Sequence, residues 1–208
     1  MNFLAHCALA ADASETWNVD AHYRRGLLAG AIIADFCKGR VNTQWPRPLQ
    51  GGIRLHRRID AVSNQHAAIR NSCQLYPKEL RRYAPIFVDI LADYHLSHRW
   101  QDYYAEPIHS FALQCYSAVA SYRNYLPEHG HKFAAYMQDS DLLSRYHDWT
   151  TIESAIRSSL RRLRRIDLTD AALSSSQAIV TQSADDFALY YEEFQGQLVA
   201  WRHLLSPA

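Results

Sequence analysis

The apolar residues of this 208-residue chain recur with helical spacing, and the alternation of apolar and polar residues that marks a β-strand is nearly absent. The last such stretch, about 184–204, carries Phe187, Tyr190, Phe194 and Trp201 at helical intervals, a pattern typical of a core-facing helix. Asn-Gly and Asp-Gly dipeptides, the usual signals of a β-hairpin, are missing. We therefore predict an all-α fold, a bundle of seven to nine helices.

Glycine and proline are scarce, and they mark the expected helix boundaries. The clearest loop covers 40–51, and Pro85 bends or divides the helix that begins near Pro77. No Gly/Ser-rich linker or low-complexity run divides the chain, so residues 1–208 are predicted to form a single domain. The expected helices are 2–12, 21–38, 52–74, 77–101, 108–125, 131–138, 141–147, 152–165 and 184–204.

The charge balance excludes some partners. With a net charge of +1, the chain has no bulk attraction for nucleic acid or for an anionic membrane, so neither is expected. The longest apolar stretch, 26–36, is too short to span a bilayer, and the apolar opening of the chain is a poor match to a signal peptide. The four cysteines form no Cys-x-x-Cys pair, which suits buried thiols in a reduced, cytoplasmic protein.

One segment, 53–66 (IRLHRRIDAVSNQH), concentrates polar chemistry on a predicted helix. His56 and Asp60 are four residues apart, so both point to one face of that helix and could hold one metal ion. An exposed His–Asp pair without an ion is the alternative interpretation, since such pairs are common and weak. Arg57 and Arg58 lie beside this pair and are candidates for a bidentate grip on phosphate.

Other chargeable residues interrupt helices that otherwise look buried. His6 interrupts FLAHCALA, Asp35 interrupts GAIIADF, and Asp89 and Asp93 lie four residues apart in IFVDILADYHL. A buried charge is costly without a partner, so each either pairs with an arginine, caps a helix or contributes to a site. Together with the His–Asp pair they come from four predicted helices, and bundles build carboxylate–imidazole metal centres in this way. Such donors suit Mn²⁺, Fe²⁺, Mg²⁺ or Zn²⁺, and a bound ion would promote hydrolysis of a phosphoester.

Four blocks of the first hundred residues resemble the acyl carrier protein phosphodiesterase family, also called holo-ACP hydrolases. The blocks are MNFLAH, LAGAIIADFCKG (28–39), GIRLHRRIDAVSNQH (52–66) and RRYAPIFVDILADYHLSHRW (81–100), and the match beyond residue 101 is weak. The resemblance implies a divergent HD-domain-like, all-α fold. It also implies a metal-dependent hydrolase, typically with Mn²⁺, that removes 4′-phosphopantetheine from the serine of holo-acyl carrier protein and leaves apo-carrier protein.

The residues that the burial argument selects match positions in the family's motifs, and Arg57 matches one as well. The candidate metal ligands are His6, Asp35, His56 and Asp60. The catalytic candidates are Arg57, which would hold phosphate, His66, which would move a proton, and Asp93, an acid of the fourth block.

Three positions depart from the family's pattern. Ala31 stands where the family usually has Asn, Asn64 where it usually has Asp, and Tyr94 where a His usually follows the acid Asp93. One helical step turns a side chain by about 100°, so His95 does not simply replace a His at the preceding position. Two alternatives therefore stay open. One is a repurposed enzyme of specialised metabolism that acts on a carrier-bound acyl thioester, and the other is a non-hydrolytic module that binds the carrier protein.

Acyl carrier proteins are acidic and helical, so the resemblance also implies a basic partner surface. The run RRLRR at 161–165, with Arg157 one turn earlier, predicts a basic stripe along the helix at 152–165. A solvated helix end is the alternative, since cations there also suit the C-terminal dipole. The candidate substrate-binding residues are Arg58, Arg161, Arg162 and Arg165.

Overall fold

Every regular element of the computed structural model, which describes residues 2–206, is helical, so the all-α prediction is confirmed. Within this range no helix is both long and apolar enough to cross a bilayer. The α-helices are α1 (Phe3–Thr16), α2 (Ala21–Ile33), α3 (Arg47–Ser63), α4 (Ala67–Gln74), α5 (Ala84–His98), α6 (Trp100–Tyr103), α7 (Ile108–Ser121), α8 (Glu128–Asp139), α9 (Trp149–Arg162) and α10 (Thr169–Gln197). Short 3-10 segments are η1 (Ala34–Phe36), η2 (Arg123–Tyr125), η3 (Leu142–His147), η4 (Ile166–Leu168) and η5 (Ala200–Leu205). The HD-domain-like detail stays a prediction.

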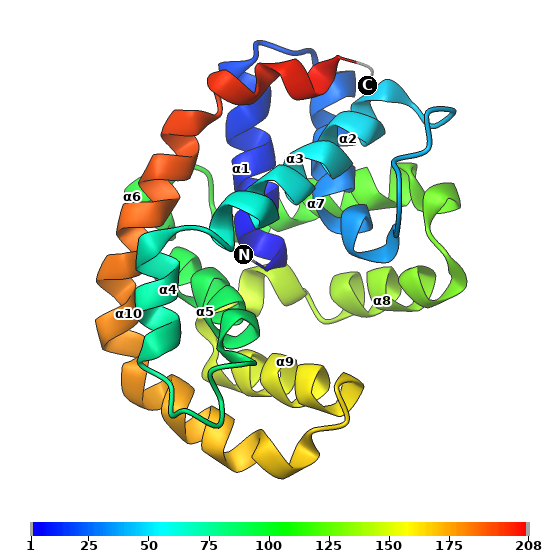
Figure 1. Cartoon of the computed structure of the whole chain (residues 1–208). Helices are drawn as coiled ribbons and strands as arrows, with labels where there is room; N and C mark the ends of the chain where they lie inside the picture. Colours follow the sequence, from blue (N-terminus) through cyan, green and yellow to red (C-terminus); the bar gives the residue numbers. More distant parts are fainter. Residues whose placement is uncertain (1, 207–208) are drawn as a thin grey trace.

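Two groups of helices share one hydrophobic core, which extends from Leu4 on α1 to Trp201 on η5 (Figure 1). α1, α2 and α3 pack against one another in the first group, and α4, α5 and α9 lie in the second. α10 runs along the edge of the molecule, contacts α4, α5 and α9, and also reaches α1. The start of α1 therefore lies in the interior, where the two groups meet.

α2 and α3 approach each other closely because glycines face each other at their crossing. A Cβ atom added at Gly30 would lie 2.6 Å from backbone atoms of Gly52, and one added at Gly52 would lie 2.6 Å from the carbonyl oxygen of Leu27. Any side chain at either position would therefore push the two helices apart. This close approach brings the backbone of Ala31 on α2 next to His56 on α3.

The first turn of α1 is capped by a carboxylate from α5. Asn2, at the N-cap position, makes no side-chain cap hydrogen bond. Instead, the two carboxylate oxygens of Asp93 accept hydrogen bonds from the backbone N–H groups of Leu4 and Ala5, each at 2.9 Å. Burial raises the pKa of Asp93 to about 7, and these two hydrogen bonds oppose the shift. Asp93 thus satisfies two otherwise unpaired donors and fixes the turn of α1 that carries His6.

The prediction of one helix at 52–74 is wrong in two respects. The helix is divided at 64–66, where His66 becomes the N-cap of α4 and its Nδ1 accepts a hydrogen bond from the backbone N–H of Ala68. It also begins earlier, at Arg47, inside the predicted loop at 40–51. Proline suits the first turn of a helix, so Pro48 starts this helix rather than preventing it.

Other predicted helices also differ from the structure. The last helix begins at Thr169 rather than near 184. The apolar pattern did not reveal its first half, because the buried face there carries small polar residues such as Ser176 and Ser183. α9 ends at Arg162 instead of 165. Residues 78–83 form turns, and α5 begins after them. The predicted helix at 141–147 is a 3-10 segment.

Candidate metal centre

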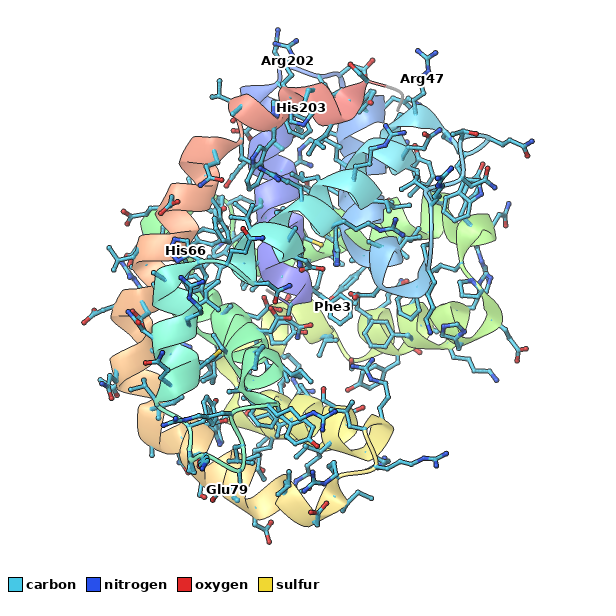
Figure 2. All side chains as sticks on the ribbon, viewed as in Figure 1. Phe3, Arg47, His66, Glu79, Arg202 and His203 are labelled. Atoms are coloured by element: carbon cyan, nitrogen blue, oxygen red, sulfur yellow. The ribbon has the colours of Figure 1, made fainter. Side chains whose placement is uncertain are left out.

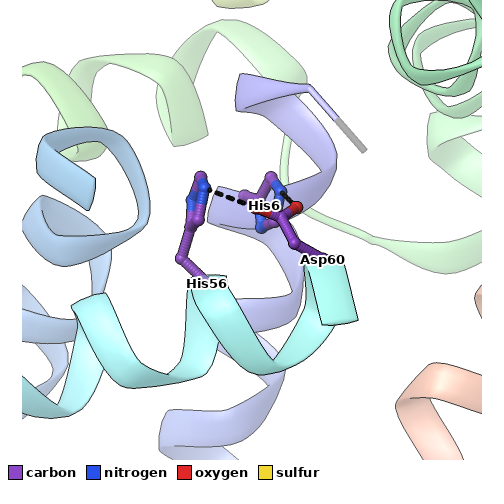
Figure 3. Close-up of side chains that lie close together, drawn as sticks. All are labelled: His6, His56 and Asp60. Atoms are coloured by element: carbon purple, nitrogen blue, oxygen red, sulfur yellow. Dashed lines mark hydrogen bonds and ion pairs between the residues drawn. The ribbon is translucent and has the colours of Figure 1, made fainter. Parts of the chain in front are cut away.

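Two imidazoles and a carboxylate from α1 and α3 converge on one point (Figure 3). His6 projects from α1, and His56 and Asp60 project from successive turns of α3, as their spacing requires. Oδ1 of Asp60 lies 3.1 Å from Nε2 of His6, and Oδ2 lies 3.2 Å from Nε2 of His56. Each residue offers one ligand atom, and these atoms lie within 4.8 Å of one another. We call this group the His6–His56–Asp60 cluster.

Asp35, the fourth predicted ligand, lies at the edge of the cluster. It belongs to η1, directly after α2, and its Oδ1 lies 3.8 Å from Nε2 of His56. Burial raises the pKa of Asp35, and the charges of His56 and Arg162 oppose this shift. The side chains of Asp35 and Asp60 are 48% and 44% exposed, whereas those of His6 and His56 are 1% and 5% exposed. The site is therefore a buried pair of imidazoles with two carboxylates that reach solvent.

His6 is neutral and only partly satisfied by the protein. Its ring stacks on that of His56, with centroids 3.8 Å apart and planes 12° apart. Burial, reinforced by the charge of His56, lowers the pKa of His6 to about 3. Its Nδ1 is buried and has no hydrogen-bond partner within residues 2–206. A neutral imidazole is the form of histidine that binds metal ions.

A backbone carbonyl sets the orientation of His56. Its Nδ1–H donates to the carbonyl oxygen of Ala31 at 2.8 Å, which leaves Nε2 directed at the two carboxylates. Burial alone would lower the pKa of His56, but the hydrogen bond to Asp60 and the charge of Asp35 outweigh it and raise the pKa. Burial likewise opposes the charge on Asp60, yet its hydrogen bonds to the two imidazoles lower its pKa. The carboxylates thus stabilise positive charge beside Nε2.

This arrangement fits a divalent cation. Two imidazole nitrogens and two carboxylate oxygens are donors that Mn²⁺, Fe²⁺ and Zn²⁺ accept. A cation bound there would displace the proton that the carboxylates stabilise on His56. The hydrogen bond from Nδ1 of His56 to the Ala31 carbonyl is the outer contact that orients a metal-binding imidazole.

Arg57 fixes the loop that follows Asp35. Its guanidinium donates to the carbonyl oxygens of Cys37 and Gly39, each at 2.6 Å. Gly39 has a φ of 75°, a left-handed conformation that favours glycine. These hydrogen bonds hold η1 and the next residues against α3. The phosphate-holding role of Arg57 stays a prediction.

Two predicted catalytic residues lie outside the cluster. Nε2 of His66 lies 2.9 Å from Oε2 of Glu193, where α4 meets α10 (Figure 2). The ring edge of His66 also packs on Phe194. Asp93 is fully buried, and its oxygens accept the backbone hydrogen bonds that cap α1. These positions favour structural roles, and the catalytic roles of His66 and Asp93 stay predictions without support from the geometry. Asp89 is half-buried on α5.

The predicted basic stripe on α9 is wrong beyond Arg162, because the helix ends there. Arg164 adopts a left-handed conformation, with φ of 57°, and the chain turns away. Arg165 then hydrogen-bonds to Asp167 and to the Tyr83 hydroxyl, so its charge is already paired.

Arg161 and Arg162 are exposed at the end of α9, and Arg162 acts on the charge of Asp35. Arg58 is exposed on α3, and its guanidinium carbon lies 5.5 Å from the centroid of the Trp201 ring.

The three departures from the family pattern occupy different environments. Ala31 contributes its backbone carbonyl to His56, a contact that does not depend on its side chain. Asn64 is exposed at the C-cap of α3. Tyr94 packs edge-on against Trp149 of α9, with ring centroids 5.4 Å apart.

Sequence reasoning missed the aromatic contacts that position the cluster. Phe133 of α8 packs against Phe3 and Phe36, with ring centroids 4.9 Å and 5.5 Å apart. Phe3 precedes His6 by one helical turn, and Phe36 follows Asp35 directly. These neighbours were visible in the sequence, but nothing in it pointed to a shared partner on α8. The Ala31 carbonyl was missed because every residue has a backbone carbonyl, so the sequence does not show which one contacts His56.

Comparisons with known proteins give one consistent result. Residues 1–194 match the model of the family described as acyl carrier protein phosphodiesterase. An acyl carrier protein phosphodiesterase of Photorhabdus laumondii is 30% identical over 197 residues, which cover 93% of this chain and 91% of that relative. Proteins of the same name from Salmonella dublin and Salmonella newport are each 30% identical over 171 residues, which cover 80% of this chain and 81% of theirs. The comparison with solved structures found no match.

Proposed function

Since the chain belongs to the acyl carrier protein phosphodiesterase family, we propose that it is a divalent-metal-dependent hydrolase that removes 4′-phosphopantetheine from holo-acyl carrier protein. The metal is proposed to be Mn²⁺, held by the His6–His56–Asp60 cluster with Asp35. The convergence of two buried imidazoles on carboxylates that reach solvent carries this proposal, because it combines a cation site with access for a large substrate.

The proposed reaction is hydrolysis of one phosphodiester. The oxygen of water forms a bond to phosphorus, the bond from phosphorus to the serine oxygen breaks, and that oxygen takes a proton. The products are 4′-phosphopantetheine and a carrier protein with an intact serine. A divalent ion, when bound, lowers the pKa of water and neutralises charge on the phosphate oxygens.

The residues of the chain prepare the site for this reaction. His6 and His56 are held by stacking and burial, and the Ala31 carbonyl directs Nε2 of His56 at the carboxylates. Arg57 holds the loop after η1 in place, and Arg162 adds positive charge within reach of Asp35. Positive charge at the edge of the site suits an acidic carrier protein and the phosphate it carries.

Intact mass spectrometry of holo-acyl carrier protein, incubated with this protein and Mn²⁺, tests the proposal. We expect loss of the whole phosphopantetheine mass, and no loss in the presence of a chelator. His56→Ala is expected to lower turnover by at least roughly a hundredfold, because it removes a proposed ligand. His109→Ala is the matched control, since His109 also pairs with an aspartate, Asp141, at 2.9 Å, but its side chain is exposed on α7.

An unchanged mass with folded, Mn²⁺-loaded protein would contradict the proposed reaction. It would favour the binding module if the carrier protein still binds. It would favour the repurposed enzyme if an acyl-loaded carrier protein loses only its acyl group. Full activity of His56→Ala would remove the cluster from the mechanism.

A further inference from the structure

A cavity of about 370 Å³ lies beside the metal centre, between the loop after η1 and the chain around η2. Its apolar walls are Phe36, Val41, Trp45, Tyr125 and Leu126. The rings of Trp45 and Tyr125 pack with centroids 5.4 Å apart, so aromatic groups face each other across the two segments. The volume falls within the range of roughly 300–1,000 Å³ that is typical of small-molecule sites.

Two residues that line the cavity lie on the elements that build the metal centre. Phe36 follows Asp35 in η1, and Ile53, which also lines the cavity, precedes His56 by one turn of α3. The loop that forms one wall is the one that Arg57 holds through two carbonyl oxygens. The cavity thus lies next to the two segments, η1 and α3, that carry Asp35 and His56.

The polar groups of the cavity indicate the chemistry of its ligand. Asn42 and Asn124 offer amide donors and acceptors, and Lys38 and Arg40 offer positive charge. No carboxylate is among the residues that line it within the described part of the chain. Apolar walls with amides suit a neutral chain of methylene and amide groups, and the two cations suit an anionic group at one end of that chain.

We propose that this cavity binds the pantetheine arm of the substrate, while the phosphate that joins the arm to serine lies at the His6–His56–Asp60 cluster. The inference rests on the proposed function and assigns a direction to the substrate. The arm extends from the cluster along η1 towards Trp45, and the carrier protein lies on the other side of the phosphate. Recognition of the arm, which every holo-carrier protein shares, would then be separate from recognition of the carrier surface.

Cys37 provides a probe that needs no substitution, because this residue lines the cavity and is half-buried. Cys73 is a matched control, since it is also half-buried but lies on α4. The full-length, Mn²⁺-loaded protein is treated with iodoacetamide at alkaline pH, with and without a thiol-free N-alkyl pantothenamide. We expect the ligand to slow alkylation of Cys37 at least threefold and to leave Cys73 unchanged. Equal alkylation of Cys37 with saturating ligand would overturn the inference.

A substitution that fills the cavity gives the second test. Val41→Trp is expected to raise KM for holo-carrier protein at least tenfold with a much smaller change in kcat, and to abolish protection of Cys37. Thr43→Trp is the matched control, because Thr43 is exposed on the same loop and does not line the cavity. Unchanged KM in a folded Val41→Trp protein would contradict the proposed position of the arm.

The two tests separate this inference from the proposed function. Protection of Cys37 without any turnover would support arm binding and contradict the hydrolysis. Turnover with no protection, and with normal KM in Val41→Trp, would support the hydrolysis and contradict the arm site.

Discussion

Buried histidines occur in both groups of helices, and their partners differ. In the first group, His6 and His56 stack and share Asp60, and Nδ1 of His6 has no hydrogen-bond partner within residues 2–206. In the second group, His95 of α5 pairs with the Ser183 hydroxyl of α10 at 2.9 Å, and burial lowers its pKa to about 4.

The difference separates a site from a structural contact. A buried histidine that meets one hydroxyl is satisfied, and it ties two helices together. Two histidines that meet the same solvent-facing carboxylate are held in an arrangement that favours an added cation. The histidines of the two groups are alike in burial. What distinguishes them is that His6 and His56 converge on one carboxylate, and that this carboxylate reaches solvent. Four experiments test this distinction.

Asp60→Asn is expected to have the largest effect, because it removes the charge shared by the two imidazoles and keeps the side-chain size. We expect Mn²⁺ affinity and turnover to fall by roughly a hundredfold or more. Titration calorimetry with Mn²⁺ and the holo-carrier mass assay measure both. Glu193→Gln, which changes the carboxylate partner of His66, is the control and should alter neither. Equal losses in the two variants would remove the distinction between the groups.

Asp93→Ala is expected to destabilise the fold by about 2–3 kcal/mol, because it leaves two buried backbone N–H groups of α1 without acceptors. A fall in Tm of roughly 5–10 °C would accompany this loss in a chain of this size. Asp93→Asn keeps one acceptor oxygen and should cost less. If Asp93→Ala instead kept its stability and lost only turnover, Asp93 would act on substrate after all.

His95 is expected to make stability depend on pH. Its folded-state pKa, about 4, lies below the ordinary value of 6.5, so the stability that comes from keeping it neutral is present above pH 6.5 and is lost as pH falls towards 4. This contribution falls by about 2 kcal/mol between pH 7 and pH 5. Urea unfolding of wild type and His95→Gln at both pH values measures it. The stability difference between the two proteins should shrink by that amount at pH 5, and a constant difference would show that His95 does not titrate in this way.

His66→Ala is expected to have the smallest effect, about 1 kcal/mol of stability, through loss of the α4 cap and of the contact with Glu193. Mn²⁺ affinity should stay the same, as measured by the same calorimetry. A large loss of turnover with unchanged stability would support the proton-carrying role that the sequence predicts for His66.

The candidate metal ligands can be identified from the sequence alone, and the reason is local. His6 and Asp35 interrupt apolar runs, and the i,i+4 spacing of His56 and Asp60 places both on one face of any helix. Sequence reasoning failed where a boundary depended on contacts made elsewhere. His66 belongs to the same motif as His56, yet the chain leaves the helix before it, and its ring packs on α10.

The sequence by itself determined the helical class and the residues that interrupt buried faces, because helical periodicity and the cost of burying charge act within a few neighbouring residues. Only the tertiary structure decided which of those residues meet. The crossing of α2 and α3 at Gly30 and Gly52 sets the distance from Ala31 to His56, and the cap that Asp93 gives to α1 fixes the turn that carries His6. Such contacts join residues far apart in the chain, so their geometry follows from packing of the whole core rather than from any local pattern.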